Sequence, residues 1–251
     1  MHIKALLPAS LIEYPGHIAD VLYVGACNFR CPYCYNVDLV LRPEQLPDMD
    51  EPSLLRQLRR RVGFVDALVI TGGEPTLQTD LIPFLSEVRQ TGAAIKLDTN
   101  GYRPDVLSQC LERGVLDYVA MDIKTTLARY EQAAGVPVEV ERVRQSIALL
   151  LHAGIDSEFR TTVVPGLLDL EDVRAIVQLI RGAKRYYLQC FRSGPTVGGM
   201  PFAPGGEDPT GDAGGSQPAA ARLPTAELLQ QMATLAAPWV QEVGIRGLGT
   251  P

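Results

Sequence analysis

The sequence predicts an α/β protein whose parallel strands form a partial (β/α)6 barrel. Two observations predict it. Short apolar, β-branched runs alternate with longer amphipathic stretches, and polar, glycine-containing motifs follow the ends of those runs. Alternating strands and helices imply a parallel sheet with right-handed crossovers. Six such units fall short of the eight that close a barrel, so one side is expected to stay open to a large substrate.

Composition limits the class of protein. The chain has 251 residues, of which 46% are hydrophobic and 21% charged, as in an ordinary globular domain. Its net charge of −6 argues against a general nucleic-acid-binding surface. No apolar run approaches the length of a membrane span, and His2, Lys4 and Glu13 interrupt any leader-like stretch. We therefore expect a cytoplasmic protein with no membrane and no nucleic-acid partner.

The elements follow in order from these runs. Residues 1–17 are expected as an N-terminal extension with a turn at Pro15-Gly16, and 18–24 as the first strand. Ser53 is a plausible N-cap for a helix whose apolar face is Leu54, Leu55, Leu58 and Val62. Further strands are expected at 67–71, 94–98, 118–123, 157–164 and 185–190, with helices near 81–90, 105–113, 139–152 and 170–181.

A change in composition divides the chain into three parts. We expect a partial-barrel core over residues 1–192 and a flexible insertion over 193–223, which is rich in Gly and Pro and poor in large apolar side chains. Residues 224–251 are expected to form a C-terminal helix, followed by a strand, that packs on the core.

Three cysteines fall within eight residues directly after the first expected strand. Cys27, Cys31 and Cys34 have the spacing C-x₃-C-x₂-C. An iron–sulfur cluster of four irons takes one sulfur ligand on each iron, so three thiolates would leave one iron open. A structural zinc site would need a fourth ligand, and His17 lies ten residues upstream without a paired ligand. The spacing is also compatible with unliganded thiols or with disulfides, and disulfides would need an oxidising compartment.

This segment resembles the cluster loop of the radical S-adenosylmethionine (SAM) enzymes, C-x₃-C-x-Φ-C, with Tyr33 at the aromatic position Φ. The resemblance implies that Cys27, Cys31 and Cys34 hold a [4Fe-4S] cluster and carry its catalysis. It also implies that SAM chelates the fourth iron through its amino and carboxylate groups, and that the partial barrel is of the radical SAM type.

The next strand end reads Gly72-Gly73-Glu74-Pro75. Two glycines allow a backbone to approach a ligand closely, although the same four residues could form a simple turn. The segment resembles the GGE motif of the radical SAM family. That resemblance implies that Gly72, Gly73 and Glu74 bind the amino group of SAM.

Two later strand ends carry acidic residues. Asp98 and Thr99 begin an Asp-Thr-Asn-Gly run that could be a plain Asx turn, and Asp122 and Lys124 face the same side of one strand, where they could form a salt bridge. Both segments resemble those of the glycyl-radical-enzyme activases. The resemblance implies that Lys124 meets the SAM carboxylate, and that Asp98, Thr99 and Asp122 hold a monovalent cation beside it.

Three further residues are candidates by the same resemblance. Arg160 opens a run similar to the activases' R-x-x-V-V-P-G and is expected to orient the methionyl carboxylate or a substrate backbone. Arg192 follows the last of the six strands, where relatives place a His or Arg that reaches SAM. Tyr35 departs from the activases' Cys-His-Asn, which leaves a ring or backbone contact to adenine as its expected role.

The opening run at residues 10–16, Ser-Leu-Ile-Glu-Tyr-Pro-Gly, is most similar to the activating proteins of anaerobic ribonucleoside-triphosphate reductase. The resemblance implies an oxidoreductase that receives one electron from a flavodoxin- or ferredoxin-type donor. It would cleave SAM to a 5′-deoxyadenosyl radical and take hydrogen from a glycine of a glycyl radical enzyme. The sequence is also compatible with a radical SAM enzyme for a small molecule or another peptide, and with a non-catalytic iron–sulfur or zinc module.

Overall fold

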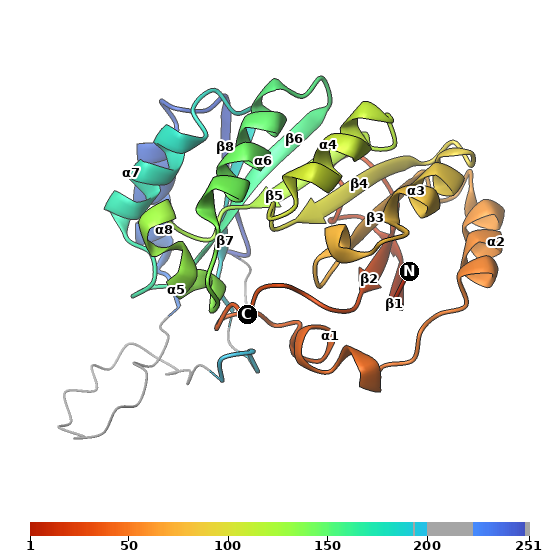
Figure 1. The fold of residues 1–251 in the computed structure, drawn as a ribbon. Coiled ribbons are helices and arrows are strands. Elements are labelled where there is room, and N and C mark those ends of the chain that lie inside the picture. The colour runs from red at the N-terminus through yellow and green to blue at the C-terminus, as the bar shows by residue number, and fades with distance from the viewer. Residues whose placement is uncertain (193, 200–222, 249–251) are drawn as a thin grey trace.

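The strands form one sheet in which sequence order is also spatial order. The computed structural model describes residues 1–192, 194–199 and 223–248. Within them β2 to β8 run parallel to one another, and β1 pairs antiparallel with β2 (Figure 1). The strands are β1 Ile3–Ser10, β2 Ala19–Val24, β3 Ala67–Gly72, β4 Ala94–Thr99, β5 Tyr118–Asp122, β6 Asp156–Val163, β7 Arg185–Cys190 and β8 Glu242–Arg246.

Helices α3, α4, α6 and α7 cover one face of the sheet, and α1 lies apart from them, below the strands in this view (Figure 1). The apolar sides of these four helices pack on outward-facing strand residues in a continuous core, where Phe84 and Ile147 meet the cluster that contains Ile70 and Val119. The helices are α1 Val37–Leu41, α2 Glu51–Arg61, α3 Leu81–Arg89, α4 Pro104–Glu112, α5 Tyr130–Ala134, α6 Val140–His152, α7 Leu170–Leu179 and α8 Ala226–Ala236.

Small side chains occupy the inner face of the sheet toward the start of the strands. Ala67 and Val69 belong to a second buried cluster that also contains Tyr14, from the β1–β2 connection, and Tyr118 of β5. The Tyr14 and Tyr118 rings lie 5.3 Å apart between centroids. Because the amino ends of the strands are filled in this way, the carboxyl ends are the place left for a site.

The predicted α/β partial barrel is confirmed, with two additions at its edges. The terminal strand suggested by the sequence is β8, which pairs with β7. Strand β1 was not predicted: residues 1–17 were expected to be an extension with a turn. Along this edge strand Leu6 and Leu7 are consecutive apolar residues and Leu7 is 44% exposed, so the sequence lacks the apolar–polar alternation of a half-buried strand.

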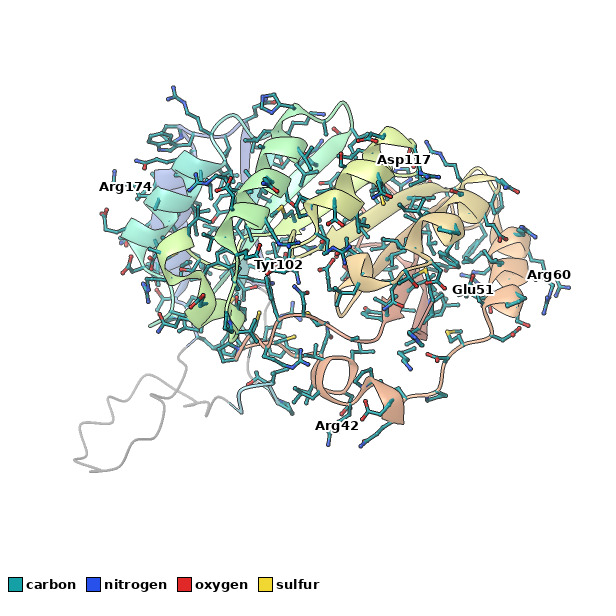
Figure 2. The ribbon with its side chains drawn as sticks, viewed as in Figure 1. Arg42, Glu51, Arg60, Tyr102, Asp117 and Arg174 are labelled. Atoms are coloured by element: carbon teal, nitrogen blue, oxygen red, sulfur yellow. The ribbon has the colours of Figure 1, made fainter. Side chains whose placement is uncertain are left out.

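One predicted helix start is wrong. Ser53 is not the N-cap of α2, because Asp50 accepts a hydrogen bond from the Ser53 backbone N–H at 2.9 Å and the helix begins at Glu51. Val62 lies past the last turn and is 49% exposed, so it is not part of the apolar face. Arg60 points away from the sheet, as expected for a solvated face (Figure 2).

The predicted division into a core, an insertion and a C-terminal part can be compared with the structure for the core and the C-terminal part. Most of 193–223 lies outside the described residues. Helix α8 packs beside α7, and β8 extends the sheet. Among the described residues, no helix has both the length and the apolar composition needed to cross a bilayer.

Candidate active site

A cavity of about 210 Å³ lies where the parallel strands end. Every residue predicted for the site except Arg192 lines it, so strand ends that are distant in sequence converge there. The lining residues are Cys27, Phe29, Cys31, Tyr33, Cys34, Tyr35, Asn36, Val40, Thr71, Gly72, Gly73, Glu74, Asp98, Thr99, Asn100, Asp122, Lys124, Arg160 and Thr162.

The three cysteine thiols come from the loop that leaves β2. The Cys34 backbone N–H donates to the Cys31 carbonyl at 3.0 Å, so a turn joins the second and third cysteines. Burial raises the pKa of Cys27 to about 12 and also raises that of Cys31. A positively charged metal centre is what deprotonates thiols in such surroundings.

The donor set fits a cluster better than a single metal ion. Among the described residues, no three His, Cys, Asp or Glu side chains are placed to hold one ion. A tetrahedral zinc needs its ligands to converge on a point, whereas a cluster takes each thiolate on a separate iron. Tyr33, which lines the same cavity, is buried, and its hydroxyl has no hydrogen-bond partner in the described chain. That free donor fits a polar ligand in the cavity.

Glu74 is buried and ties the end of β3 to the end of β4. Its Oε1 accepts hydrogen bonds from the hydroxyls of Thr76 at 2.5 Å and Thr99 at 2.7 Å, and its Oε2 accepts one from the Asn100 backbone N–H at 2.7 Å. Burial raises the pKa of Glu74, and these hydrogen bonds offset only part of that rise. Because Oε2 accepts only the Asn100 bond in the described part of the chain, it keeps a lone pair for one further hydrogen-bond donor.

Acidic and basic side chains alternate across the ends of β4, β5 and β6. Arg160 donates from Nε to Asp122 Oδ1 at 2.8 Å and from Nη1 to Asp98 Oδ2 at 3.0 Å. Lys124 Nζ lies 3.0 Å from Asp122 Oδ2, and Lys96 Nζ lies 3.1 Å from Asp98 Oδ1. We call these five side chains the charge network. It carries one positive charge in excess.

The charge network fixes the ionisation of its two carboxylates. Burial alone raises the pKa of Asp122, but the charges of Arg160 and Lys124 outweigh it and hold the pKa well below the usual range. Burial of Asp98 is likewise outweighed by Arg160 and Lys96, which leaves its pKa lowered. Both groups therefore remain ionised at neutral pH.

Three of the four Asp98 and Asp122 oxygens expected to hold a monovalent cation accept hydrogen bonds from Lys124 or Arg160, whereas the buried Asp98 Oδ1 has no hydrogen-bond partner among the described residues. Each oxygen of Asp98 and Asp122 faces a Lys or Arg, and Thr99 Oγ1 donates to Glu74 and accepts from the Gly101 N–H at 3.0 Å. A further cation would join a network that is already positive. The monovalent cation stays a prediction for this site.

Tyr35 and Arg192 meet each other at the rim of the site. The Tyr35 hydroxyl hydrogen-bonds to the Arg192 main chain, and its ring stacks on Phe191 with centroids 5.6 Å apart. The Arg192 guanidinium points toward Gly247, past the end of β8. The structure thus places the Arg192 side chain outside the cavity, and the main chain of Arg192 fixes the aromatic ring.

Two asparagines that the sequence did not single out connect the motifs. Asn36 Nδ2 donates to the Gly72 carbonyl at 2.6 Å, and Asn100 Nδ2 donates to Asn28 Oδ1 at 2.9 Å. Asn36 lies two residues after the last cysteine of the motif and Asn100 directly follows the end of β4, so an amide side chain within or next to a motif was the available signal.

Comparison with known proteins identifies the family of this chain. The model of the radical SAM superfamily matches residues 21–180. The chain is 30% identical over 194 residues to a Methanocaldococcus jannaschii protein named "Putative glycyl-radical enzyme activating enzyme", covering 75% of this chain and 79% of that one. It is 27% identical over 189 residues to a Pyrobaculum aerophilum protein named "Probable GTP 3′,8-cyclase", covering 72% and 61%.

A solved structure shares the fold. A domain of pyruvate-formate lyase-activating enzyme from Bacteroides vulgatus superposes with a TM-score of 0.52 at 16% sequence identity, over 72% of this chain and 99% of that one. At this identity the likeness concerns the fold alone.

Proposed function

Because this chain belongs to the radical SAM superfamily, whose enzymes use a [4Fe-4S] cluster and SAM, we propose that it activates a glycyl radical enzyme. The observation that carries the proposal is the alignment with the Methanocaldococcus jannaschii protein, which spans most of both chains at 30% identity. The run at residues 10–16 supports a partner of the anaerobic ribonucleoside-triphosphate reductase type. The electron would come from a flavodoxin- or ferredoxin-type protein.

The residues of the cavity would have separate roles in binding the cluster and SAM. A bound cluster would supply the one electron that breaks the S–C5′ bond of SAM, giving methionine and the 5′-deoxyadenosyl radical that would take a hydrogen atom from the glycine Cα. Cys27, Cys31 and Cys34 would hold the cluster. Lys124, at the cavity end of the positive charge network, would bind the SAM carboxylate through a charge-assisted hydrogen bond. Gly73 would bring its backbone close to the amino group.

The proposal is tested with the partner protein. Anaerobically reconstituted protein is incubated with SAM, a reductant and a glycyl radical enzyme encoded beside it, and the electron paramagnetic resonance (EPR) spectrum is recorded. A glycyl radical signal that is lost in Cys31→Ala supports the activase role. Cleavage of SAM without a glycyl signal for any such partner would reject that role while leaving the family assignment in place.

A second function has its own supporting observation. The Pyrobaculum aerophilum relative is named for a cyclase that acts on GTP, and the alignment covers 72% of this chain. A radical SAM enzyme acting on a small molecule would share the same cavity at the strand ends. Incubation with GTP, followed by mass spectrometry of the products and of deuterium carried into 5′-deoxyadenosine, distinguishes the two functions.

A further inference from the structure

The cysteine loop, residues 25–36, is held by main-chain contacts from segments far away in the sequence. The first contact comes from the end of β3. The Glu74 backbone N–H donates to the Ala26 carbonyl at 2.8 Å, and a Cβ added to Gly73 would stand 1.9 Å from that carbonyl oxygen. The hydrogen bond joins the end of β3 to the cysteine loop, and the missing Cβ of Gly73 leaves room for the two backbones to approach this closely.

The same device recurs at the end of α5. The Arg30 backbone N–H donates to the Ala134 carbonyl at 2.7 Å, and the next residue, Gly135, has a φ of +69°. A Cβ on Gly135 would lie 2.2 Å from the Arg30 carbonyl oxygen. Gly135 therefore meets two requirements: a left-handed backbone and a close approach to the loop between Cys27 and Cys31.

A third contact comes from the segment after β7. The Val197 N–H donates to the Cys34 carbonyl at 2.9 Å, and the Gly198 N–H donates to the Pro32 carbonyl at 3.0 Å. A Cβ on Gly198 would stand 2.6 Å from Pro32 Cβ and 2.7 Å from its Cα. The close approach alone calls for glycine here, because the φ of Gly198 is not among the positive ones.

The third contact sets the geometry of the second and third cysteines. Pro32 lies between Cys31 and Cys34 in the sequence. A displaced Pro32 would therefore move the two thiols relative to each other. The stacking of Tyr35 on Phe191 adds a side-chain contact from the same side. No other part of the cavity fixes these two main-chain carbonyls in the described residues.

We infer that Gly135 and Gly198 are positioning residues for the cluster ligands: they allow distant main chain to clamp the cysteine loop in its binding geometry before a cluster is present. A methyl group at either position pushes the loop away from its clamp. The inference rests on the family assignment and needs no glycyl radical partner, so it stands or falls separately from the proposed function.

The test compares matched pairs of glycines. Gly198→Ala is compared with Gly154→Ala, because a Cβ on Gly154 meets nothing within 4 Å and its φ is ordinary. Gly135→Ala is compared with Gly114→Ala, whose φ of +62° carries a similar backbone strain and whose Cβ also meets nothing. The difference within each pair isolates the close approach to the loop from other costs of adding a methyl group.

Two measurements are made on each variant. Release of iron from the reconstituted protein to a chelator should be about tenfold faster or more in Gly198→Ala and Gly135→Ala than in their controls, as expected for groups that orient metal ligands. In the cluster-free protein, alkylation of Cys31 should also be faster, because its burial is lost. Circular dichroism and urea unfolding show whether each variant is folded.

Equal rates of iron release and alkylation within both pairs would overturn the inference. If Gly198→Ala does not fold, Tyr35→Phe takes its place, because it removes the hydroxyl that bonds to the Arg192 main chain in the same segment. Faster iron release in folded Tyr35→Phe supports the clamp, and an unchanged rate contradicts it.

Discussion

The cysteine loop and the charge network form two sides of one cavity, but different interactions hold them. Main-chain hydrogen bonds at close glycine approaches, as at Gly73 and Gly198, hold the loop together with neutral side-chain hydrogen bonds such as that of Asn36. Side-chain ion pairs hold the network, with Arg160 bridging two carboxylates. The position of the predicted metal ligands therefore depends on backbone fit, whereas the surface proposed to bind SAM depends on charge balance.

Substitutions should therefore affect the two regions differently. Small changes of shape should damage the loop and spare the charge network, and small changes of charge should do the reverse. In the sequence both regions are short motifs. Only the fold shows that main-chain hydrogen bonds hold one of them and ion pairs hold the other.

The largest expected effect falls on the loop. Cys31→Ala should abolish the four-iron cluster, because one iron loses its thiolate. Iron and sulfide content and the visible absorption of the anaerobically reconstituted protein measure this loss. Cys110→Ala is the control, since that buried thiol lies in α4, outside the cavity. A full four-iron spectrum in Cys31→Ala would show that the ligand assignment is wrong.

Within the charge network, the largest loss of stability should follow the removal of Arg160, which bridges the two carboxylates. Arg160→Leu leaves Asp98 and Asp122 without their shared counter-charge, which should lower the free energy of unfolding by about 3–5 kcal/mol. Urea denaturation of the cluster-free protein measures it. Arg174→Leu, in an exposed pair on α7, should change stability by about 0.5 kcal/mol or less. Similar values for both variants would contradict the account.

SAM binding should depend on Lys124, at the cavity end of the charge network. Lys124→Met should weaken SAM binding by about 10- to 100-fold while the cluster content stays intact, because a hydrogen bond to a charged group is lost. Isothermal titration of the cluster-loaded protein measures the affinity. Lys184→Met, far from the cavity and exposed, should leave it unchanged. An unchanged affinity in Lys124→Met would refute the contact.

The dependence of protein stability on pH should reveal the contribution of the Asp98 and Asp122 carboxylates. Their pKa values are lowered in the folded protein, so their contribution is present above the ordinary carboxyl pKa and is lost as the pH falls below about 4 toward the folded values. Asp122→Asn should therefore lower stability at pH 7 and flatten its loss in acid. Asp38→Asn, on the surface, should keep the steep acid loss. Parallel acid curves for Asp122→Asn and the unsubstituted protein would contradict the assignment.

The smallest effect should come from the monovalent cation. Because Lys and Arg already face the Asp98 and Asp122 oxygens, replacing potassium chloride by choline chloride at equal ionic strength should change the Kd for SAM by less than about twofold. A large loss of affinity in choline would show that a cation displaces these side chains when SAM binds.

Much of the site could be predicted from the sequence, because its residues occur in short motifs beside strand ends. Cys31, Glu74 and Lys124 are of this kind. The bridge from Arg160 to Asp98 and Asp122 could not be predicted, since it needs the lateral order of the strands and the rotamer of one long side chain. Gly135 and Gly198 were missed for a similar reason, because each is required only by a distant backbone.

The fold was predictable to a similar degree. Parallel strands buried on both faces give continuous apolar runs, which is why β3 and β5 were placed within a residue of their ends. Strand β1 was missed because an edge strand carries no such pattern. The N-cap of α2 was misplaced because Asp50 and Ser53 are both good capping residues and only the backbone geometry at Asp50 decides between them.

The EPR spectrum of the anaerobically reconstituted and reduced protein, recorded before and after addition of SAM, tests the central claim most directly. The account predicts a four-iron signal that changes on addition, because three cysteines leave one iron open for the cofactor. A protein that holds no four-iron cluster, or a signal that stays the same with saturating SAM, would contradict it.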